Sequence, residues 1–322
     1  MSQTPSLTKV SSGAAGVDTH PPAIDTDNLA KSYGKITALA GLTMSVPKGE
    51  VFGFLGPNGA GKTTAVKLLL GLVRPTSGQA SVLGSPLGNR EARRKVGYLP
   101  ELFRYQEWLS AREVLMLHCE LAGVSQARRT SEINAALDIV GLVRRADDRV
   151  GTFSKGMQQR LGLGVALLGE PELIFLDEPT SALDPIGRYD VREVIRELKQ
   201  RGTTVFLNSH LLSEVEQVCD RVAVVDHGKV IAIGPMADII GVASTVRVRA
   251  TGLTTASEMA LARFGTPETE GDWYTFRGVT ENDIPDLVEE VVRLGGRVYS
   301  VESRHESLED RFIQLLQEVG EA

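Results

Sequence analysis

The stretch Gly56-Pro57-Asn58-Gly59-Ala60-Gly61-Lys62-Thr63-Thr64 decides the fold of this chain. It follows an apolar run at 51–55 and precedes apolar residues at helical spacing over 62–73, which predicts strand, loop and helix in that order. Glycines in such a loop let successive backbone N–H groups face a polyphosphate, and the helix N-terminus adds the positive end of its dipole. Lys62 can neutralise the outer phosphates, and Thr63 can hold Mg²⁺. We therefore expect ATP or GTP as ligand, with Mg²⁺.

A second apolar run, at 173–176, ends in Asp177-Glu178. With a phosphate-binding loop in the same chain, this pattern predicts that Asp177 orients Mg²⁺ through water and that Glu178 polarises the attacking water. Taken alone, the same pattern also fits a buried strand with a capped end. The loop favours the catalytic interpretation.

Length, charge and cysteine content exclude several classes of protein. The 322 residues suggest one large and one small domain, and the net charge of −6 gives no general attraction to nucleic acid or anionic lipid. Cys119 and Cys219 lie far apart, which fits a reducing compartment and argues against a zinc site or a disulfide framework. No apolar run approaches the roughly 20 residues needed to cross a bilayer, and the first residues do not resemble a secretory signal. We expect a cytoplasmic protein.

The pattern along the chain predicts an α/β fold with a second, smaller α+β domain. Residues 1–22 lack apolar periodicity and are expected to be a disordered tail. An antiparallel region and then strands alternating with helices follow in 23–240, with a helical insert at about 100–150; this order predicts a mainly parallel sheet covered on both faces. Residues 241–322 show strands and helices in an order of the ferredoxin-like type, and then a last helix.

Two local patterns in the last 82 residues lead to further expectations. Residues 245–250 alternate as in an edge strand. The final helix carries an apolar stripe at Leu308, Phe312, Leu315 and Leu316, so one of its faces must be buried. We expect the stripe to close the core of the C-terminal domain; contact with another subunit is the alternative.

The segment Phe153-Ser154-Lys155-Gly156-Met157 lies between the two motifs and carries a resemblance to a known family. The chain resembles the ATP-binding subunits of ABC transporters, whose signature is usually L-S-G-G-Q. Ser154 and Gly156 match that signature, whereas Phe153, Lys155 and Met157 depart from it in a way that is similar to the branch serving ABC-2-type exporters. The resemblance covers residues 24–240 and implies a P-loop NTPase fold that binds and hydrolyses ATP.

The resemblance also implies roles for single residues. Tyr33 matches the aromatic that stacks on adenine, the alternative being an ordinary turn tyrosine. His210 matches the histidine that contacts the γ-phosphate and joins Lys62 and Glu178 in catalysis. Glu101 stands where the family usually has a glutamine that senses Mg²⁺ and couples to the membrane subunit. It could ligate the metal, contact only the partner, or belong to a plain solvated loop.

The family's split site implies the partners. Ser154 and Gly156 would contact the nucleotide held by a second subunit, and one copy of each motif per chain implies a head-to-tail dimer, expected to be a homodimer. A transmembrane permease would be the other partner, placing the chain peripherally on the inner face of the cell membrane without nucleic acid. The resemblance favours the ATPase subunit of an exporter. The alternatives are an importer ATPase with a C-terminal regulatory domain, or a soluble ABC ATPase acting on ribosomes or DNA.

Overall fold

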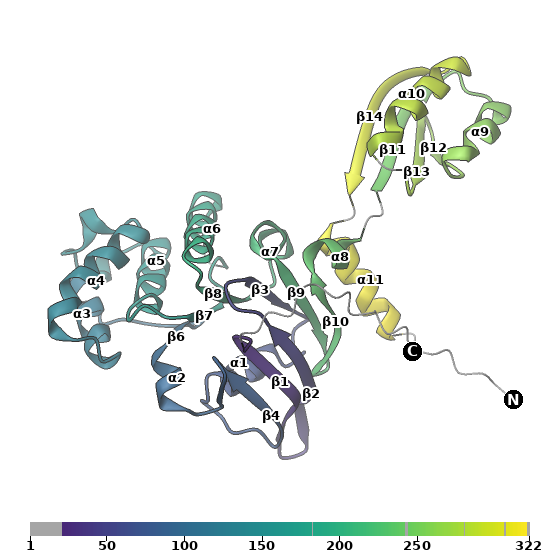
Figure 1. The fold of residues 1–322 in the computed structure, drawn as a ribbon. Coiled ribbons are helices and arrows are strands. Elements are labelled where there is room, and N and C mark those ends of the chain that lie inside the picture. Colours follow the sequence, from purple (N-terminus) through teal and green to yellow (C-terminus); the bar gives the residue numbers. More distant parts are fainter. Residues whose placement is uncertain (1–20, 182, 242–243, 280, 306, 321–322) are drawn as a thin grey trace, which may run out of the picture.

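The structure is a computed structural model that describes residues 21–320 apart from 182, 242–243, 280 and 306. The tail expected at 1–22 lies outside the described residues except for its last two. Figure 1 shows two antiparallel sheets and one mainly parallel sheet, with the helices around them.

The central sheet has six strands in the order β10-β9-β3-β8-β7-β6. All neighbours are parallel except β10, which runs antiparallel to β9. Its strands are β3 (Val51–Leu55), β6 (Val96–Leu99), β7 (Leu173–Asp177), β8 (Thr204–Asn208), β9 (Arg221–Asp226) and β10 (Lys229–Pro235). Because the central strands are parallel, the segments that follow β3, β6, β7 and β8 all emerge at one edge, where both predicted motifs begin.

Both faces of this sheet are buried, as predicted. In β3, Phe52 and Phe54 belong to a core shared with α1 and the first antiparallel sheet, whereas Val51 and Leu55 belong to a core shared with the later helices. On the first face lies α1 (Lys62–Leu69), and the later helices on the second face include α5 (Lys155–Ala166), α6 (Pro185–Gln200) and α7 (Leu212–Val218). Helix α1 ends before the predicted residue 73 because Gly71 adopts a positive φ of 66°.

An antiparallel sheet in the order β2-β1-β4-β5 packs on the α1 side of the molecule. It contains β1 (Ile24–Tyr33), β2 (Ile36–Val46), β4 (Ser77–Val82) and β5 (Ser85–Pro86), and the short helix α2 (Arg90–Arg94) follows it. The predicted antiparallel region is therefore confirmed. The turn between β1 and β2 places Tyr33 at the end of its strand.

The helical insert consists of α3 (Ala111–Leu121) and α4 (Gln126–Ile139), followed by short 3₁₀ turns at Val143–Arg145 and Val150–Thr152. Ser110 accepts a hydrogen bond from the Glu113 backbone, and the Glu113 carboxylate accepts one from the Ser110 N–H. This capping box fixes the start of α3. Figure 1 shows α3, α4 and α5 grouped together at one side of the parallel sheet.

The third sheet, in the order β12-β13-β11-β14, is fully antiparallel. Together with two helices on one face it forms the ferredoxin-like unit, residues 244–305. Its elements are β11 (Ser244–Thr251), α9 (Thr255–Leu261), β12 (Glu268–Glu270), β13 (Trp273–Arg277), α10 (Ile284–Arg293) and β14 (Arg297–His305). Their order and pairing match the ferredoxin-like topology predicted.

The expectation that 245–250 is an edge strand is wrong, because β11 lies between β13 and β14. Val246, Val248 and Ala250 are buried under the helices, and the residues between them face the other side of the sheet. Alternation reveals that one face is covered, but it does not show which strands lie on either side.

The last helix, α11 (Leu308–Gly320), does not close the core of the ferredoxin-like unit. Leu308 and Leu315 are buried in the core of the nucleotide-type domain, and Phe312 packs against it; the helix contacts α7, β10 and the short helix α8 (Met236–Ile240). The Leu308 N–H donates to the Glu216 carboxylate of α7 over 3.1 Å. The boundary at residue 240 stays a proposal. Because of these contacts, we assign α11 to the first domain, to which the chain returns after the ferredoxin-like unit.

Candidate nucleotide site

The phosphate-type loop is tightly packed at its two ends and open in its middle. A Cβ atom on Gly56 would lie 2.3 Å from the Val225 carbonyl oxygen, and one on Gly61 would lie 2.3 Å from the Ala38 carbonyl oxygen. Gly59 has a positive φ of 85° and open space around it. Since Gly61 caps α1 without a side chain, the first N–H groups of the helix remain donors without an intrahelical partner, as an anion site requires.

Lys62 folds back over this loop. Its Nζ donates to the Gly56 carbonyl over 2.7 Å and to the Pro57 carbonyl over 3.1 Å. Burial lowers the pKa of Lys62, and the negative charges of Glu178, Asp177 and Glu101 oppose that shift. The ammonium group therefore lies among the loop and the carboxylates, which is where outer phosphates would have to be neutralised.

Asp177 is a buried carboxylate at the end of β7, only 3% exposed. Asn208 Nδ2 donates to Asp177 Oδ1 over 2.5 Å. Burial raises the pKa of Asp177, while the hydrogen bond from Asn208 and the charge of Lys62 lower it. The arrangement holds an oxygen ligand in a fixed orientation, close to the cation of Lys62.

Asn208 was not identified from the sequence. Asp177 and Asn208 are register partners in the parallel pair β7 and β8, so they end at the same level of the sheet. Aligning the ends of the two predicted strands would have brought the residues together, because side chains at matching ends of parallel strands share one edge.

Glu178 and His210 form a close pair next to that edge. Glu178 has a positive φ of 52°, and its N–H donates to the Asn208 carbonyl over 2.8 Å. Glu178 Oε2 lies 2.7 Å from His210 Nδ1; the carboxylate is largely buried, whereas the imidazole is exposed. Ser181 Oγ donates to the Glu178 carbonyl over 3.1 Å. The carboxylate is thus held by its backbone and by a neighbouring ring, in the way that a general base is held by an orienting group.

Glu101 follows β6 and is exposed. Burial raises the pKa values of Asp177 and Tyr98, and the negative charge of Glu101 adds to both shifts. The same charge opposes the lowering of the Lys62 pKa by burial. Glu101 is therefore part of the electrostatic environment of Lys62 and Asp177, and the three interpretations of its role considered above stay open.

Three further predicted site residues lie on elements that do not carry Lys62, Asp177, Glu178 or His210: they are Tyr33, Ser154 and Gly156. Tyr33 is 47% exposed at the β1–β2 turn, with Lys31 Nζ 5.0 Å from its ring centroid. Ser154 caps α5 by accepting a hydrogen bond from the Met157 N–H over 3.2 Å. Gly156 faces Leu183: a Cβ there would lie 3.4 Å from Leu183 Cδ2.

The loop around Leu183 is only partly described, since residue 182 is not among the described residues. Asp184 caps α6 by accepting a hydrogen bond from the Gly187 N–H over 2.8 Å. The signature segment and this loop thus adjoin each other, at the N-termini of α5 and α6.

The residues present fit a nucleotide with Mg²⁺. Thr63 lies exposed in the first turn of α1, and Asp177 and Glu101 supply carboxylate oxygens, which are ligands that Mg²⁺ prefers. Among the described residues, no three His, Cys, Asp or Glu side chains converge on one point. Mg²⁺ does not need such a group, because it is usually held by one or two carboxylates together with substrate phosphates.

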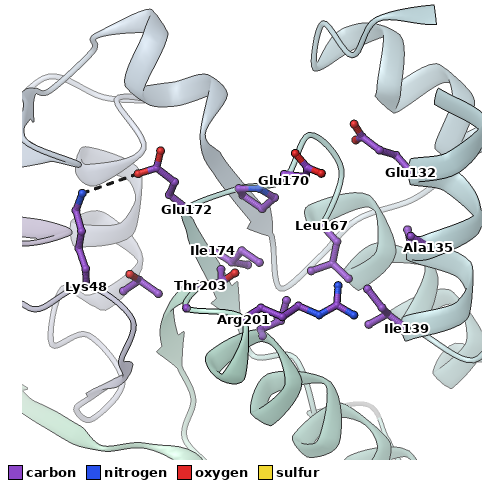
Figure 2. A pocket seen from close by; sticks show the side chains of 15 residues that line it. Lys48, Glu132, Ala135, Ile139, Leu167, Glu170, Glu172, Ile174, Arg201 and Thr203 are labelled. Atoms are coloured by element: carbon purple, nitrogen blue, oxygen red, sulfur yellow. Dashed lines mark ion pairs between the residues drawn. The ribbon is translucent and has the colours of Figure 1, made fainter. Parts of the chain in front are cut away.

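A cavity of about 540 Å³ lies at the opposite end of the sheet (Figure 2). Glu172 and Thr203, which precede β7 and β8, line it together with α4 residues such as Ile139. Lys48 and Glu172 form an ion pair of 3.9 Å at its edge. None of the predicted site residues lines it, because they all lie at or beyond the carboxyl ends of the strands, or on α5 and the β1–β2 turn.

No described helix of this chain has the length and apolar character needed to span a membrane.

Comparisons with known proteins agree with the geometry of the site. Residues 39–181 match the family model described as ABC transporter. An ABC transporter ATP-binding protein of Nostoc sp. (strain PCC 7120) is 41% identical, covering 92% of this chain and 90% of the relative. The Nod factor export ATP-binding protein I of Rhizobium sp. (strain N33) is 40% identical, covering 66% of this chain and 70% of the relative.

A solved structure described as the ATP binding subunit of an ABC transporter is 33% identical with a TM-score of 0.62, covering 67% of this chain and 91% of that one. The fold predicted from the phosphate loop, the P-loop NTPase domain of ABC ATPases, is confirmed. The chain therefore belongs to the ATP-binding proteins of ABC transporters, which hydrolyse ATP to drive transport.

Proposed function

We propose that this chain is the ATP-hydrolysing subunit of an ABC-2-type exporter and that it drives a separate transmembrane permease. The observation that carries this proposal is the cluster of Lys62, Asp177, Glu178 and His210 at one edge of the parallel sheet. Export rather than import is supported by the relative named for Nod factor export and by the Ser-Lys-Gly-Met form of the signature. Import remains the alternative, and a soluble ATPase is less well supported.

The chemistry follows from the positions of the side chains. The N–H groups of the loop and the ammonium of Lys62 bind the phosphates, and Glu178 accepts the proton of the attacking water. His210 orients the Glu178 carboxylate from the solvent side through the 2.7 Å contact. It would also contact the γ-phosphate of the bound ATP. Thr63, Asp177 and Glu101 would hold Mg²⁺, which when bound neutralises charge on the phosphates. Tyr33 would stack on the adenine.

The site is completed by a second copy of the chain. The positive charges at the loop come from Lys62 and the α1 N-terminus, and both lie on one side of the phosphates. Ser154 and Gly156 at the N-terminus of α5 offer a hydroxyl, N–H groups and a helix dipole, but on a different element. A head-to-tail homodimer brings the α5 N-terminus of one copy to the loop of the other. Closure and opening of this dimer is the step that transmits force.

The permease is proposed to contact the surface between α2 and α3. A groove of about 530 Å³ there is lined by Arg90, Arg93, Arg94, Leu121 and other residues of α2, β6, α3 and α5. Leu121 is 74% exposed. An apolar side chain left in water beside arginines is typical of an interaction surface.

The loop after Glu101 adjoins this groove, because the Tyr105 ring packs edge-on against His118, which lines the groove, with ring centroids 5.6 Å apart. The loop also exposes apolar side chains, Leu102 at 86% and Trp108 at 71%. The same loop therefore connects the proposed metal site to the proposed permease surface. We therefore propose that the chain lies on the inner face of the membrane and is held there only through the permease.

The proposed catalytic role is tested with Glu178→Gln. ATP binding should persist, turnover should fall by about 10² to 10⁴, and addition of ATP should trap a dimer that size-exclusion chromatography detects. Glu170→Gln is a matched control, since Glu170 has the same positive φ of 52° and lies at the other end of β7, paired with Arg128. Near-normal turnover of Glu178→Gln, or equal losses in both variants, would remove Glu178 from the proposed role.

A further inference from the structure

The two edges of the ferredoxin-like sheet differ in a way that points to a partner. At one edge, β12 is three residues long, and its sequence Glu268-Thr269-Glu270 is fully exposed. Short, charged edges of this kind prevent pairing with another strand. At the other edge, β14 is nine residues long and, among the described residues, pairs only with β11. The described part of the chain places no other strand beside the outer side of β14.

Apolar side chains accompany this open edge. Tyr299 is 62% exposed and Val301 is 37% exposed. Figure 1 shows β14 along one side of the unit, with β11 as its neighbour; α10 packs on the face of the sheet and contacts β14 there. A long edge strand with exposed apolar residues is a template for pairing with a further strand.

An irregularity in β14 determines which residues share a face. Ser300 pairs with Arg249 and Val298 pairs with Ala250, so Tyr299 is the extra residue of a bulge. As a result Val298 and Val301 both lie on the face that the helices cover. Arg297 and Glu302 both lie on the opposite face, since their register partners do.

This pattern is complementary to itself in antiparallel orientation. If a two-fold axis passes between Tyr299 and Ser300, Val298 of one strand lies opposite Val301 of the other, and Arg297 lies opposite Glu302. Apolar residues then meet apolar residues on one face, and opposite charges meet on the other, twice each. A slip of one residue would place Val298 opposite Glu302 and lose this match.

We propose that β14 pairs with β14 of a second copy of this chain, so that two ferredoxin-like units form one continuous eight-stranded sheet. This inference rests on the proposed function, because the head-to-tail ATPase dimer supplies the second copy. Antiparallel pairing of two identical edges is isologous, as is the two-fold ATPase dimer, so the proposal is that one two-fold axis relates both contacts. The strand contact alone is small for a stable interface. It therefore supports a dimer that the nucleotide sites also hold, through a raised effective concentration.

Disulfide formation tests the contact in the full chain. Ser300→Cys is introduced together with Glu178→Gln, so that ATP binding and the ATP-dependent dimer are measured in the same preparation. In the proposed register the two introduced cysteines lie on one face with Cα atoms about 6 Å apart, within disulfide reach. We expect mild oxidation to give a covalent dimer at a level about tenfold above that of the controls.

Three controls make the experiment specific. Thr269→Cys lies on the opposite, protected edge. Arg297→Cys lies on the same strand but would be on the order of 15 Å from its copy. The chain without an introduced cysteine tests Cys119 and Cys219, which are both buried. None of these should crosslink. In addition, Tyr299→Lys should reduce the Ser300→Cys crosslink about tenfold, because it places like charges beside the axis.

The outcomes separate this inference from the proposed function. If the ATP-dependent dimer forms and Ser300→Cys does not crosslink, strand pairing is wrong and β14 is left for another partner, such as an extended segment of the permease. Crosslinking of Arg297→Cys or Thr269→Cys to the same extent would also overturn it. If no dimer forms with ATP at all, the proposed ATPase dimer fails first.

Discussion

At the scale of single residues, the site carries charge and backbone strain that folding alone would not select. Asp177 is buried next to other carboxylates, and Glu178 adopts a positive φ that is uncommon for a residue with a side chain. Both features have a clear use if a cation and a phosphate enter the site. Without that use they would only lower stability.

Asp177→Asn should make the chain without nucleotide more stable and less active. Burial raises the pKa of Asp177, so the folded chain binds a proton more readily than the unfolded chain and loses stability as pH rises from the ordinary carboxyl range through the raised value. Asparagine keeps an oxygen that can accept from Asn208 and removes that loss. Thermal melting at pH 7 should show a midpoint a few degrees higher, as a gain of about 1 kcal/mol gives. The gain should vanish at a pH below the ordinary carboxyl pKa. A lower midpoint at pH 7 would contradict this argument.

His210→Ala should lower ATP turnover by about 10², while nucleotide binding changes little. The reason is the 2.7 Å contact with Glu178 Oε2, which orients the carboxylate. His227→Ala is the matched control, since His227 Nδ1 also lies 2.7 Å from a carboxylate, that of Asp226, on an exposed turn. Steady-state ATPase assays should leave His227→Ala near the wild-type rate. Equal effects of the two substitutions would indicate a general electrostatic cause.

At the scale of elements, local sequence predicted most of the nucleotide domain. The phosphate loop lies where it was expected, and like the capping box at Ser110 and the cap at Asp184 it is encoded within a few residues. The place of α11 could not be predicted in the same way. Its apolar stripe shows that one face is buried, but the partner surface on α7, α8 and β10 is assembled from distant parts of the chain.

The position of β11 and the pairing of Asn208 with Asp177 were missed for a related reason. Both depend on which strands become neighbours, and periodicity within one strand carries no information about that. Residue roles that depend on a bound phosphate, or on a second chain, are further from what a single sequence encodes. The roles of Ser154, Glu101 and Tyr33 accordingly remain predictions.

Two shortened chains should separate α11 from the ferredoxin-like unit. Replacing residues 244–305 by a short Gly-Ser link should leave ATP binding and melting of the nucleotide domain nearly unchanged, because Ser244 and His305 are register partners and the ends therefore lie close together. Truncation after Ile240 removes α11 as well, and it should destabilise that domain.

Leu308→Ala in the full chain tests the packing of α11 alone. It should lower the free energy of unfolding by about 2–5 kcal/mol, since Leu308 is completely buried. Chemical denaturation measures the free energy of unfolding of the two shortened chains and of Leu308→Ala. Equal stability of the two shortened chains would show that α11 contributes nothing to the nucleotide domain.

At the scale of the whole molecule, we propose that Glu101 connects ATP hydrolysis to the permease. Its charge acts on Lys62 and Asp177, and the loop that follows it exposes Leu102. Glu101→Gln should retain coupling, whereas Glu101→Ala should keep much of the ATPase of the isolated chain and reduce transport. The measurement is transport per ATP hydrolysed, in vesicles containing the permease. An unchanged ratio in Glu101→Ala would confine Glu101 to the exposed loop.

The split site predicts that two inactive chains can restore each other. Lys62→Ala disables the phosphate loop but leaves the signature segment intact, and Ser154→Arg does the reverse. A head-to-tail dimer of one chain of each kind contains one site built from two intact halves, and the other site is defective in both. With random mixing, half of the dimers are mixed and each has one working site, so ATPase activity should return to about a quarter of wild type. Each variant alone should stay inactive at any concentration. A mixture no more active than its components, in preparations that still form dimers, would mean that each chain completes its own site, because only a site shared between chains can be rebuilt by mixing.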